Sequence, residues 1–173
     1  MEELELTYLA KTLPSDLEKA EKKEMLDIYI PASSDHPTLR IRKNGDKHEI
    51  TKKQPIVDGD ASRQLETTIK LTPAEFADLS QLPGKRVQKT RYLFQENNVN
   101  YEIDVFGGDL TGLVLVDVEF PTVEAKSAFS PPDWCLAEVT QETFLAGGML
   151  CGKKYSDIEN NLAKFGYQKV NLE

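Results

Sequence analysis

Charged residues of one sign recur two positions apart in several segments of this chain. Such pairs include Glu3 and Glu5, Arg40 and Arg42, Lys89 and Arg91, and Asp117 and Glu119. In an extended strand, residues two apart point to the same side and lie about 6.6 Å from each other. Like charges held side by side repel each other. The repeated pattern therefore indicates that ligands of opposite charge neutralise these pairs.

The two signs suit two different ligands. Carboxylates gathered together attract a hard divalent cation, and oxygen-only ligands favour Mg²⁺ or Mn²⁺ over zinc. Guanidinium groups match phosphate oxygens in pairs, and lysines add positive charge. The predicted metal ligands are Glu3, Glu5, Asp104, Asp117 and Glu119, and the predicted anion-binding residues are Arg40, Arg42, Lys53, Lys89 and Arg91. The alternative interpretation is a sheet with one buried face and one ordinary solvated face.

The elements that must position these residues are mostly strands, because short stretches with apolar residues at every second position alternate with turn signals. The predicted strands are 3–9, 27–30, 38–43, 47–53, 64–71, 85–94, 100–106 and 113–120. Asn44-Gly45 and Asn97-Asn98 are hairpin signals, since these residues tolerate positive φ. We expect a mostly β (α+β) fold: an antiparallel sheet of eight strands joined mainly as hairpins, which can close into a barrel.

Helices are fewer and shorter than strands. Thr72, Pro73 and Glu75 have the spacing of an N-cap, a first-turn proline and a capping-box glutamate, which predicts a short helix ending near Leu79. A second helix is predicted over 156–165, with weaker candidates at 122–129 and 141–145. The mixed charges over 16–24 indicate a solvated helix or loop.

The segment 147–153 resembles a phosphate-binding loop, but Lys154 stands where that motif needs Ser or Thr, which favours a glycine-rich turn.

Length and composition limit the class of protein. The chain has 173 residues, which fits one domain spanning 1–173, and 21 basic against 29 acidic residues give a net charge of −8. This balance argues against nonspecific nucleic-acid binding. No apolar run approaches the roughly 20 residues of a membrane helix, and the start lacks the layout of a signal peptide. We therefore expect a cytoplasmic protein with no membrane or nucleic-acid partner, either a monomer or a homodimer.

The order of the charged motifs resembles the CYTH superfamily, the triphosphate tunnel metalloenzymes, over most of the chain. The matching pieces are Glu3-Leu4-Glu5, Leu39-Arg40-Ile41-Arg42, Ile50-Thr51-Lys52-Lys53, Glu66, Lys89-Thr90-Arg91, 102–106 and 113–120. The resemblance implies a closed tunnel of eight antiparallel strands with peripheral helices. It also implies that the carboxylates named above hold the metal and that the basic residues hold a triphosphate. Catalytic roles fall on Lys53, which shares its side of the strand with Thr51, and on Glu66 and Glu102, which orient a metal, a water or the cationic groups.

The sequence departs from the family signature Glu-x-Glu-x-Lys, because Thr7 stands where the lysine belongs. A threonine hydroxyl can donate a hydrogen bond but carries no charge. The predicted function is divalent-metal-dependent hydrolysis of inorganic triphosphate or a related organic or nucleoside triphosphate. Two alternatives stay open. One is cyclisation of ATP, as in class IV adenylate cyclases, and the other is a polyphosphate- or nucleotide-binding module whose catalysis Thr7 has weakened.

Overall fold

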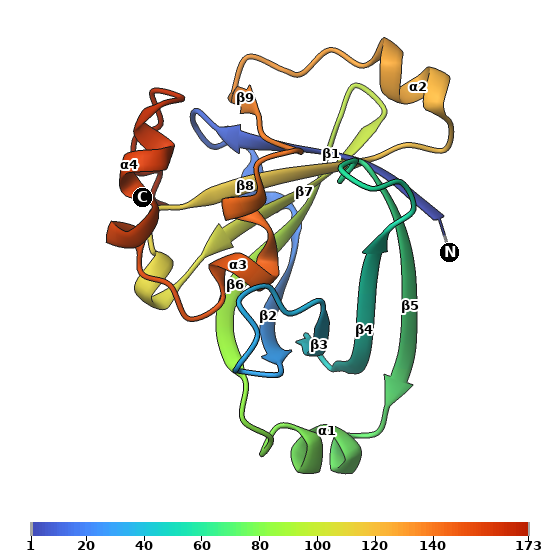
Figure 1. Ribbon diagram of the computed structural model, residues 1–173. Coiled ribbons are helices and arrows are strands. Elements are labelled where there is room, and N and C mark those ends of the chain that lie inside the picture. The colour runs from blue at the N-terminus through green and yellow to red at the C-terminus, as the bar shows by residue number, and fades with distance from the viewer. Residues whose placement is uncertain (1, 173) are drawn as a thin grey trace.

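The computed structural model describes residues 2–172, and they form a β-barrel with short helices at its periphery (Figure 1). The strands are β1 (Glu2–Ala10), β2 (Glu21–Ile30), β3 (Leu39–Asn44), β4 (Lys47–Pro55), β5 (Arg63–Leu71), β6 (Lys85–Glu96), β7 (Val99–Phe106), β8 (Val114–Glu119) and β9 (Cys135–Glu138). The α-helices are α1 (Pro73–Leu79), α2 (Val123–Ala128), α3 (Gly147–Leu150) and α4 (Tyr155–Ala163). Three 3-10 turns are η1 (Leu17–Lys19), η2 (Gly108–Leu110) and η3 (Thr143–Leu145).

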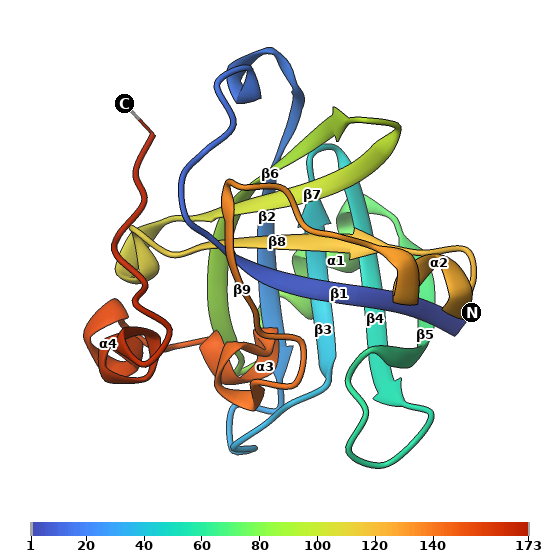
Figure 2. The same ribbon diagram turned by 90° about the horizontal axis from the view of Figure 1, so that it is seen from above.

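The strands pair in the order β5-β4-β3-β2-β6-β7-β8-β1, and β1 closes the barrel by pairing with β5. Every pairing is antiparallel. Seen from above, β1, β7 and β8 run across the strands β2 to β5 (Figure 2). The closed, eight-stranded antiparallel barrel predicted from the sequence is therefore confirmed, with β9 added beside β1.

Local sequence signals explain where several elements begin and end. The side chain of Thr72 accepts a hydrogen bond from the backbone N–H of Glu75, and Glu75 reciprocates, so α1 begins with the predicted capping box. Asn97 and Asn98 have φ angles of 52° and 62°, which gives the β6–β7 hairpin its tight turn. The first tight hairpin, β3–β4, turns at Gly45 with φ 57°.

Two segments differ from the sequence prediction. The prediction of a helix or loop over 16–24 was wrong at its end, because β2 begins at Glu21 and pairs there with Leu93 of β6. The glycine-rich segment forms the single helical turn α3, where a simple turn was predicted. None of the described helices is both long and apolar enough to cross a bilayer.

Apolar side chains pack in two clusters, one of which includes inward-facing residues of the barrel. Leu9, Val87, Phe106 and Leu115 lie two residues along their strands from Thr7, Lys89, Asp104 and Asp117, so each shares the inward face with a polar or charged residue. They pack against Leu145 of η3 and Leu150 of α3. In Figure 1, α3 and the loop between β2 and β3 lie together over this part of the molecule.

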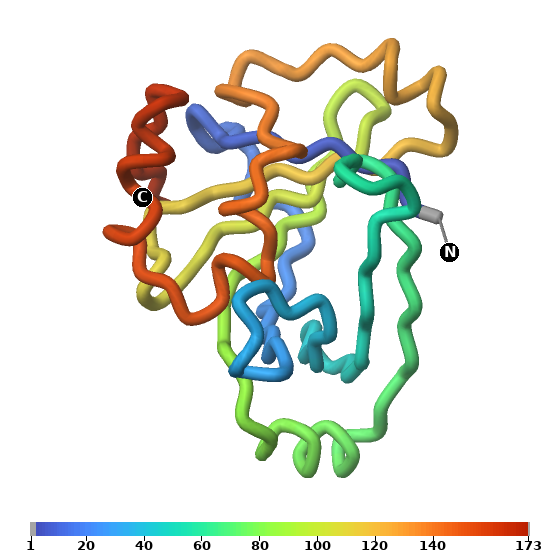
Figure 3. Tube along the Cα trace, in the orientation of Figure 1, coloured from blue at the N-terminus to red at the C-terminus, as the bar shows by residue number. Residues whose placement is uncertain are grey.

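The Cα trace shows the same arrangement: β1 begins on the side of the molecule opposite the C-terminal helix α4 and runs across toward it (Figure 3). The second cluster contains Tyr8, Tyr92, Tyr101, Val116 and Val118, which point outward from their strands. The loop before β9 covers it, with Trp134 against Tyr101 at 5.0 Å between ring centroids. Burial of the outer face leaves the barrel interior for the charged residues.

Candidate active site

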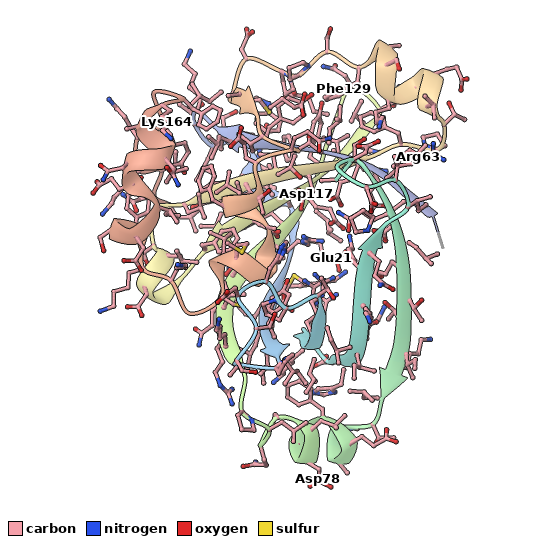
Figure 4. The ribbon with its side chains drawn as sticks, in the orientation of Figure 1. Glu21, Arg63, Asp78, Asp117, Phe129 and Lys164 are labelled. Atoms are coloured by element: carbon pink, nitrogen blue, oxygen red, sulfur yellow. The ribbon has the colours of Figure 1, made fainter. Side chains whose placement is uncertain are left out.

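The interior of the barrel contains a cavity of about 620 Å³, which we call the ionic cavity. All of the residues predicted from the sequence to hold a metal, bind an anion or act in catalysis line it. These residues are Glu3, Glu5, Arg40, Arg42, Lys53, Glu66, Lys89, Arg91, Glu102, Asp104, Asp117 and Glu119. In Figure 4, Asp117 lies in the middle of the molecule, whereas Asp78 on α1 and Lys164 after α4 lie at its periphery.

Strand register brings the charges together. Glu5 of β1 lies opposite Glu119 of β8, and Asp117 of β8 lies opposite both Thr7 of β1 and Glu102 of β7. The carboxylates therefore gather on the part of the barrel formed by β7, β8 and β1. We call this set, Glu3, Glu5, Glu102, Asp117 and Glu119, the acidic wall.

Two arginines are held by buried aspartates. Arg42 donates from Nε to Asp27 Oδ1 at 2.6 Å and from Nη2 to Oδ2 at 2.7 Å. Arg91 donates from Nε to Asp104 Oδ1 and from Nη2 to Oδ2, both at 2.7 Å. Both aspartates are only 2% exposed. Paired, bidentate contacts of this kind are what a buried carboxylate and guanidinium need to remain ionised away from water.

Asp104 also accepts a hydrogen bond from Lys89, and Arg91 forms a further ion pair with Glu102. Both carboxylate oxygens of Asp104 thus accept bonds from cationic groups. Burial alone raises the pKa of Asp104, but the charges of Arg91 and Lys89 outweigh it and hold that pKa well below its ordinary value. Asp104 is therefore ionised, and both of its carboxylate oxygens accept hydrogen bonds from the basic residues Arg91 and Lys89.

Lys53 forms ion pairs with three carboxylates of the cavity. Its Nζ lies 2.6 Å from Glu3 Oε2, 3.6 Å from Glu66 Oε2 and 3.8 Å from Glu5 Oε2. Burial alone lowers the pKa of Lys53, but the neighbouring Glu5 and Glu3 raise it above its ordinary value. The ammonium is therefore charged at any physiological pH.

Arg40 is held more loosely than the other arginines of the cavity. Its Nη1 donates to the Tyr29 hydroxyl at 3.4 Å and its Nη2 lies 3.7 Å from Glu66 Oε2. Its Nε is buried and has no hydrogen-bond partner among the described residues. A guanidinium with unused donors in an enclosed cavity is suited to bind an anion.

The acidic wall carries an excess of negative charge. Burial, followed by the charge of Asp117, raises the pKa of Glu5 to about 7, although Lys53 opposes the shift. Burial and the charge of Asp104 raise the pKa of Asp117, and burial and Glu102 raise that of Glu119. Burial and the neighbouring carboxylates thus both disfavour the ionised forms, and a divalent cation would offset the repulsion.

The donor chemistry of the acidic wall fits a hard cation, since every ligand would be an oxygen. The side chains are not already arranged around one point: among the described residues, no group of three or more His, Cys, Asp or Glu side chains has the geometry to hold a metal ion. Binding a metal here would require the carboxylates to rotate toward it.

Thr7 occupies the position at which the sequence departs from the CYTH signature. Its Oγ1 donates to Asp117 Oδ1 at 2.8 Å, and its backbone N–H donates to Thr140 Oγ1 at 3.0 Å. The hydroxyl therefore orients a carboxylate of the acidic wall, where a lysine would place a positive charge.

Several lining residues were not identified from the sequence. Asp27 and Tyr29 share the inward face of β2. The predicted strand 27–30 contained both residues, but neither was assigned a role. The segment from Thr140 to Gly148 also lines the cavity. A Cβ on Gly147 would lie 2.1 Å from the Tyr29 hydroxyl, and one on Gly148 would lie 2.1 Å from the Pro37 carbonyl oxygen. The two glycines therefore allow α3 to approach the barrel closely, which explains the glycine motif without a phosphate loop.

The fold and the cavity together define a β-barrel protein with an interior lined by ion pairs. The family model of the CYTH domain matches residues 1–130. The chain belongs to the CYTH domain family.

Known relatives fit this assignment. The chain is 35% identical over 144 residues to an inorganic triphosphatase of Nitrosomonas europaea, covering 82% of this chain and 91% of the relative. It is 32% identical over 73 residues to an inorganic triphosphatase of Acetivibrio thermocellus, covering 42% and 46% of the two chains. A crystal structure of an inorganic triphosphatase superposes with a TM-score of 0.64 at 28% identity, covering 87% of this chain and 95% of that chain.

Proposed function

We propose that this protein hydrolyses inorganic triphosphate in the ionic cavity, with Mg²⁺ or Mn²⁺ as cofactor. The observation that carries the proposal is the gathering of Arg40, Arg42, Lys53, Lys89 and Arg91 beside the acidic wall in one enclosed space. A polyphosphate chain is an anion that binds through both many cationic donors and a metal. The inorganic triphosphatase of Nitrosomonas europaea, 35% identical to this chain, supports the same choice of substrate.

The basic residues would bind and orient the triphosphate. Arg42 offers the guanidinium N–H groups that Asp27 leaves free. Arg40, held by a long bond to Tyr29 and a contact with Glu66, would turn its donors toward the anion. Arg91 contributes mainly its charge, because Asp104, Glu102 and Asp117 already accept from its N–H groups. Lys89 and Lys53 add positive charge near the phosphate oxygens. Charge that develops on these oxygens during phosphoryl transfer is thereby stabilised by groups already in place.

The acidic wall would hold the cation through Glu3, Glu5, Asp117 and Glu119, with Asp104 as the further predicted ligand. A bound divalent cation would neutralise charge on the phosphate oxygens. Glu66 lies between Lys53 and Arg40, and Glu102 pairs with Arg91. These two glutamates would therefore orient the cationic residues.

The test is phosphate release by the purified protein from inorganic triphosphate, pyrophosphate, ATP and thiamine triphosphate, each with Mg²⁺, Mn²⁺ or EDTA. We expect metal-dependent release of phosphate that is fastest from inorganic triphosphate. Formation of cyclic AMP and pyrophosphate from ATP would instead identify a cyclase. Tight binding of triphosphate without turnover would identify a binding module.

A further inference from the structure

Asp27 is a buried carboxylate on the inward face of β2, directly opposite Arg42 of β3. Its neighbours on that face are the buried Met25 and Tyr29, so it interrupts an otherwise uncharged stretch. Burying a charge in this way is unfavourable unless a partner compensates it. The residue therefore needs a structural or functional reason for its position.

Arg42 supplies the compensation through two parallel hydrogen bonds of 2.6 and 2.7 Å. Burial alone raises the pKa of Asp27, but Arg42 lowers it to about 2, so the pair is ionised at neutral pH. A guanidinium has five N–H donors in one plane. Asp27 accepts from Nε and Nη2, which fixes that plane and leaves both hydrogens of Nη1 and one of Nη2 for another acceptor.

Arg91 is held in the same way: its Nε and Nη2 donate hydrogen bonds to Asp104. β2 and β7, which carry the two aspartates, both pair with β6, which carries Arg91. Arg40 lacks such a bidentate partner among the described residues, and it is the arginine with a buried, unsatisfied Nε. The cavity therefore contains two arginines held at fixed orientation and one held loosely.

We propose that Asp27 is a positioning residue for substrate binding: it holds the Arg42 guanidinium so that its remaining N–H groups face the triphosphate. The proposal rests on the proposed function. A long side chain fixed before binding loses less conformational entropy when the ligand arrives. A phosphate group then meets donors already oriented to bond two of its oxygens.

The competing explanation is that Asp27 simply offsets the positive charge of the cavity. The two explanations predict opposite effects for removal of its charge. If Asp27 only offsets charge, Asp27→Asn leaves Arg42 with more attraction for phosphate, and binding tightens. If Asp27 orients Arg42, the substitution sets an amide N–H₂ or a single oxygen against the guanidinium, and binding weakens.

The experiment is isothermal titration calorimetry with imidotriphosphate, a nonhydrolysable analogue, with and without Mg²⁺. We expect Asp27→Asn to weaken binding about tenfold, as loss of one oriented charge-assisted contact implies. The same substitution made together with Arg42→Lys should have little further effect, because the lysine has no plane to orient. Tighter binding by Asp27→Asn, or equal effects in both backgrounds, would overturn the proposal.

Asp27→Glu provides a second variant that keeps the charge in case the asparagine variant does not fold. The longer side chain displaces the pair, so we expect weaker binding, whereas an unchanged affinity would mean that only the charge matters. The matched control is Asp78→Asn, which removes an exposed carboxylate on α1 that does not line the cavity, and it should bind as the unaltered protein does. Failure of the proposed function appears separately, as absence of binding or turnover by the unaltered protein.

Discussion

Thr7 Oγ1 donates a hydrogen bond of 2.8 Å to Oδ1 of Asp117, the residue directly opposite it on β8. A side chain two atoms long thus reaches the carboxylate whose second oxygen lies 3.4 Å from Arg91 Nη2. The acidic wall is therefore tied to the basic residues through Asp117. A charged side chain at position 7 would enter the same contact.

Thr7→Lys should raise the turnover of triphosphate several-fold, because an ammonium beside Asp117 adds a positive charge close to the phosphate oxygens. Thr7→Val keeps the shape of the side chain and removes its hydroxyl, so it should lower turnover about tenfold by releasing Asp117. The measurement is kcat with inorganic triphosphate and Mg²⁺. An unchanged kcat in Thr7→Lys would mean that another group already fulfils the role of the family lysine.

Arg40→Ala should raise KM for triphosphate about tenfold or more and should affect kcat less, since this cavity-lining guanidinium is loosely held and can turn its donors to the bound anion. Arg86→Ala is the control, because Arg86 lies exposed on β6 and is not among the residues that line the cavity. Steady-state kinetics over a range of triphosphate concentrations separates the two parameters. Equal KM values for the two variants would contradict the assignment of Arg40 to substrate binding.

Glu5→Gln should weaken the dependence of activity on Mg²⁺ and should alter the stability of the metal-free protein. Burial and Asp117 raise the pKa of Glu5 from 4.5 to about 7. The folded protein then retains a proton that the unfolded chain releases, so stability falls as pH rises from about 4.5 to about 7. Thermal unfolding in EDTA across this range should show the loss, and Glu5→Gln should flatten it. Adding Mg²⁺ at pH 7 should restore stability to the unaltered protein.

The control for this titration is Glu124→Gln, which removes a carboxylate exposed on α2. Its unfolding curves should follow those of the unaltered protein at every pH. A profile for Glu5→Gln as steep as that of the unaltered protein would show that another carboxylate of the acidic wall holds the proton.

Gly147→Ala should lower kcat/KM, because the added Cβ would lie 2.1 Å from the Tyr29 hydroxyl, which contacts Arg40. Combining it with Tyr29→Phe removes the closest clashing atom and should restore part of the lost folding stability. Gly107→Ala is the matched control, since a Cβ there would meet nothing within 4 Å. Thermal unfolding and kcat/KM measured together test the contact. Equal behaviour of the two alanine variants would contradict it.

The alternation of side chains along each strand predicted which of them point inward, because this alternation does not depend on how the strands pair. It therefore predicted that the charged residues would line one interior. The alternation carries no information about which strands are neighbours. It therefore could not predict that Arg42 donates hydrogen bonds to Asp27 or that Glu5 lies opposite Glu119. Those contacts depend on register across segments far apart in the sequence.

Two further failures have local causes. The start of β2 was missed because Lys22, Lys23 and Glu24 have the composition of a solvated segment, and only pairing with β6 makes it extended. β9 was missed because it is four residues long and is stabilised mainly by pairing with β1. Asp27 was placed on a strand, but a lone carboxylate among apolar residues gave no same-sign partner to identify it.

The apolar part of the barrel, where Phe106 and Leu115 pack with Leu145 and Leu150, limits where a multiply charged substrate can bind. A multiply charged phosphate gains nothing by entering hydrocarbon. A bound triphosphate would therefore lie among the charged residues and leave this apolar part of the cavity unfilled.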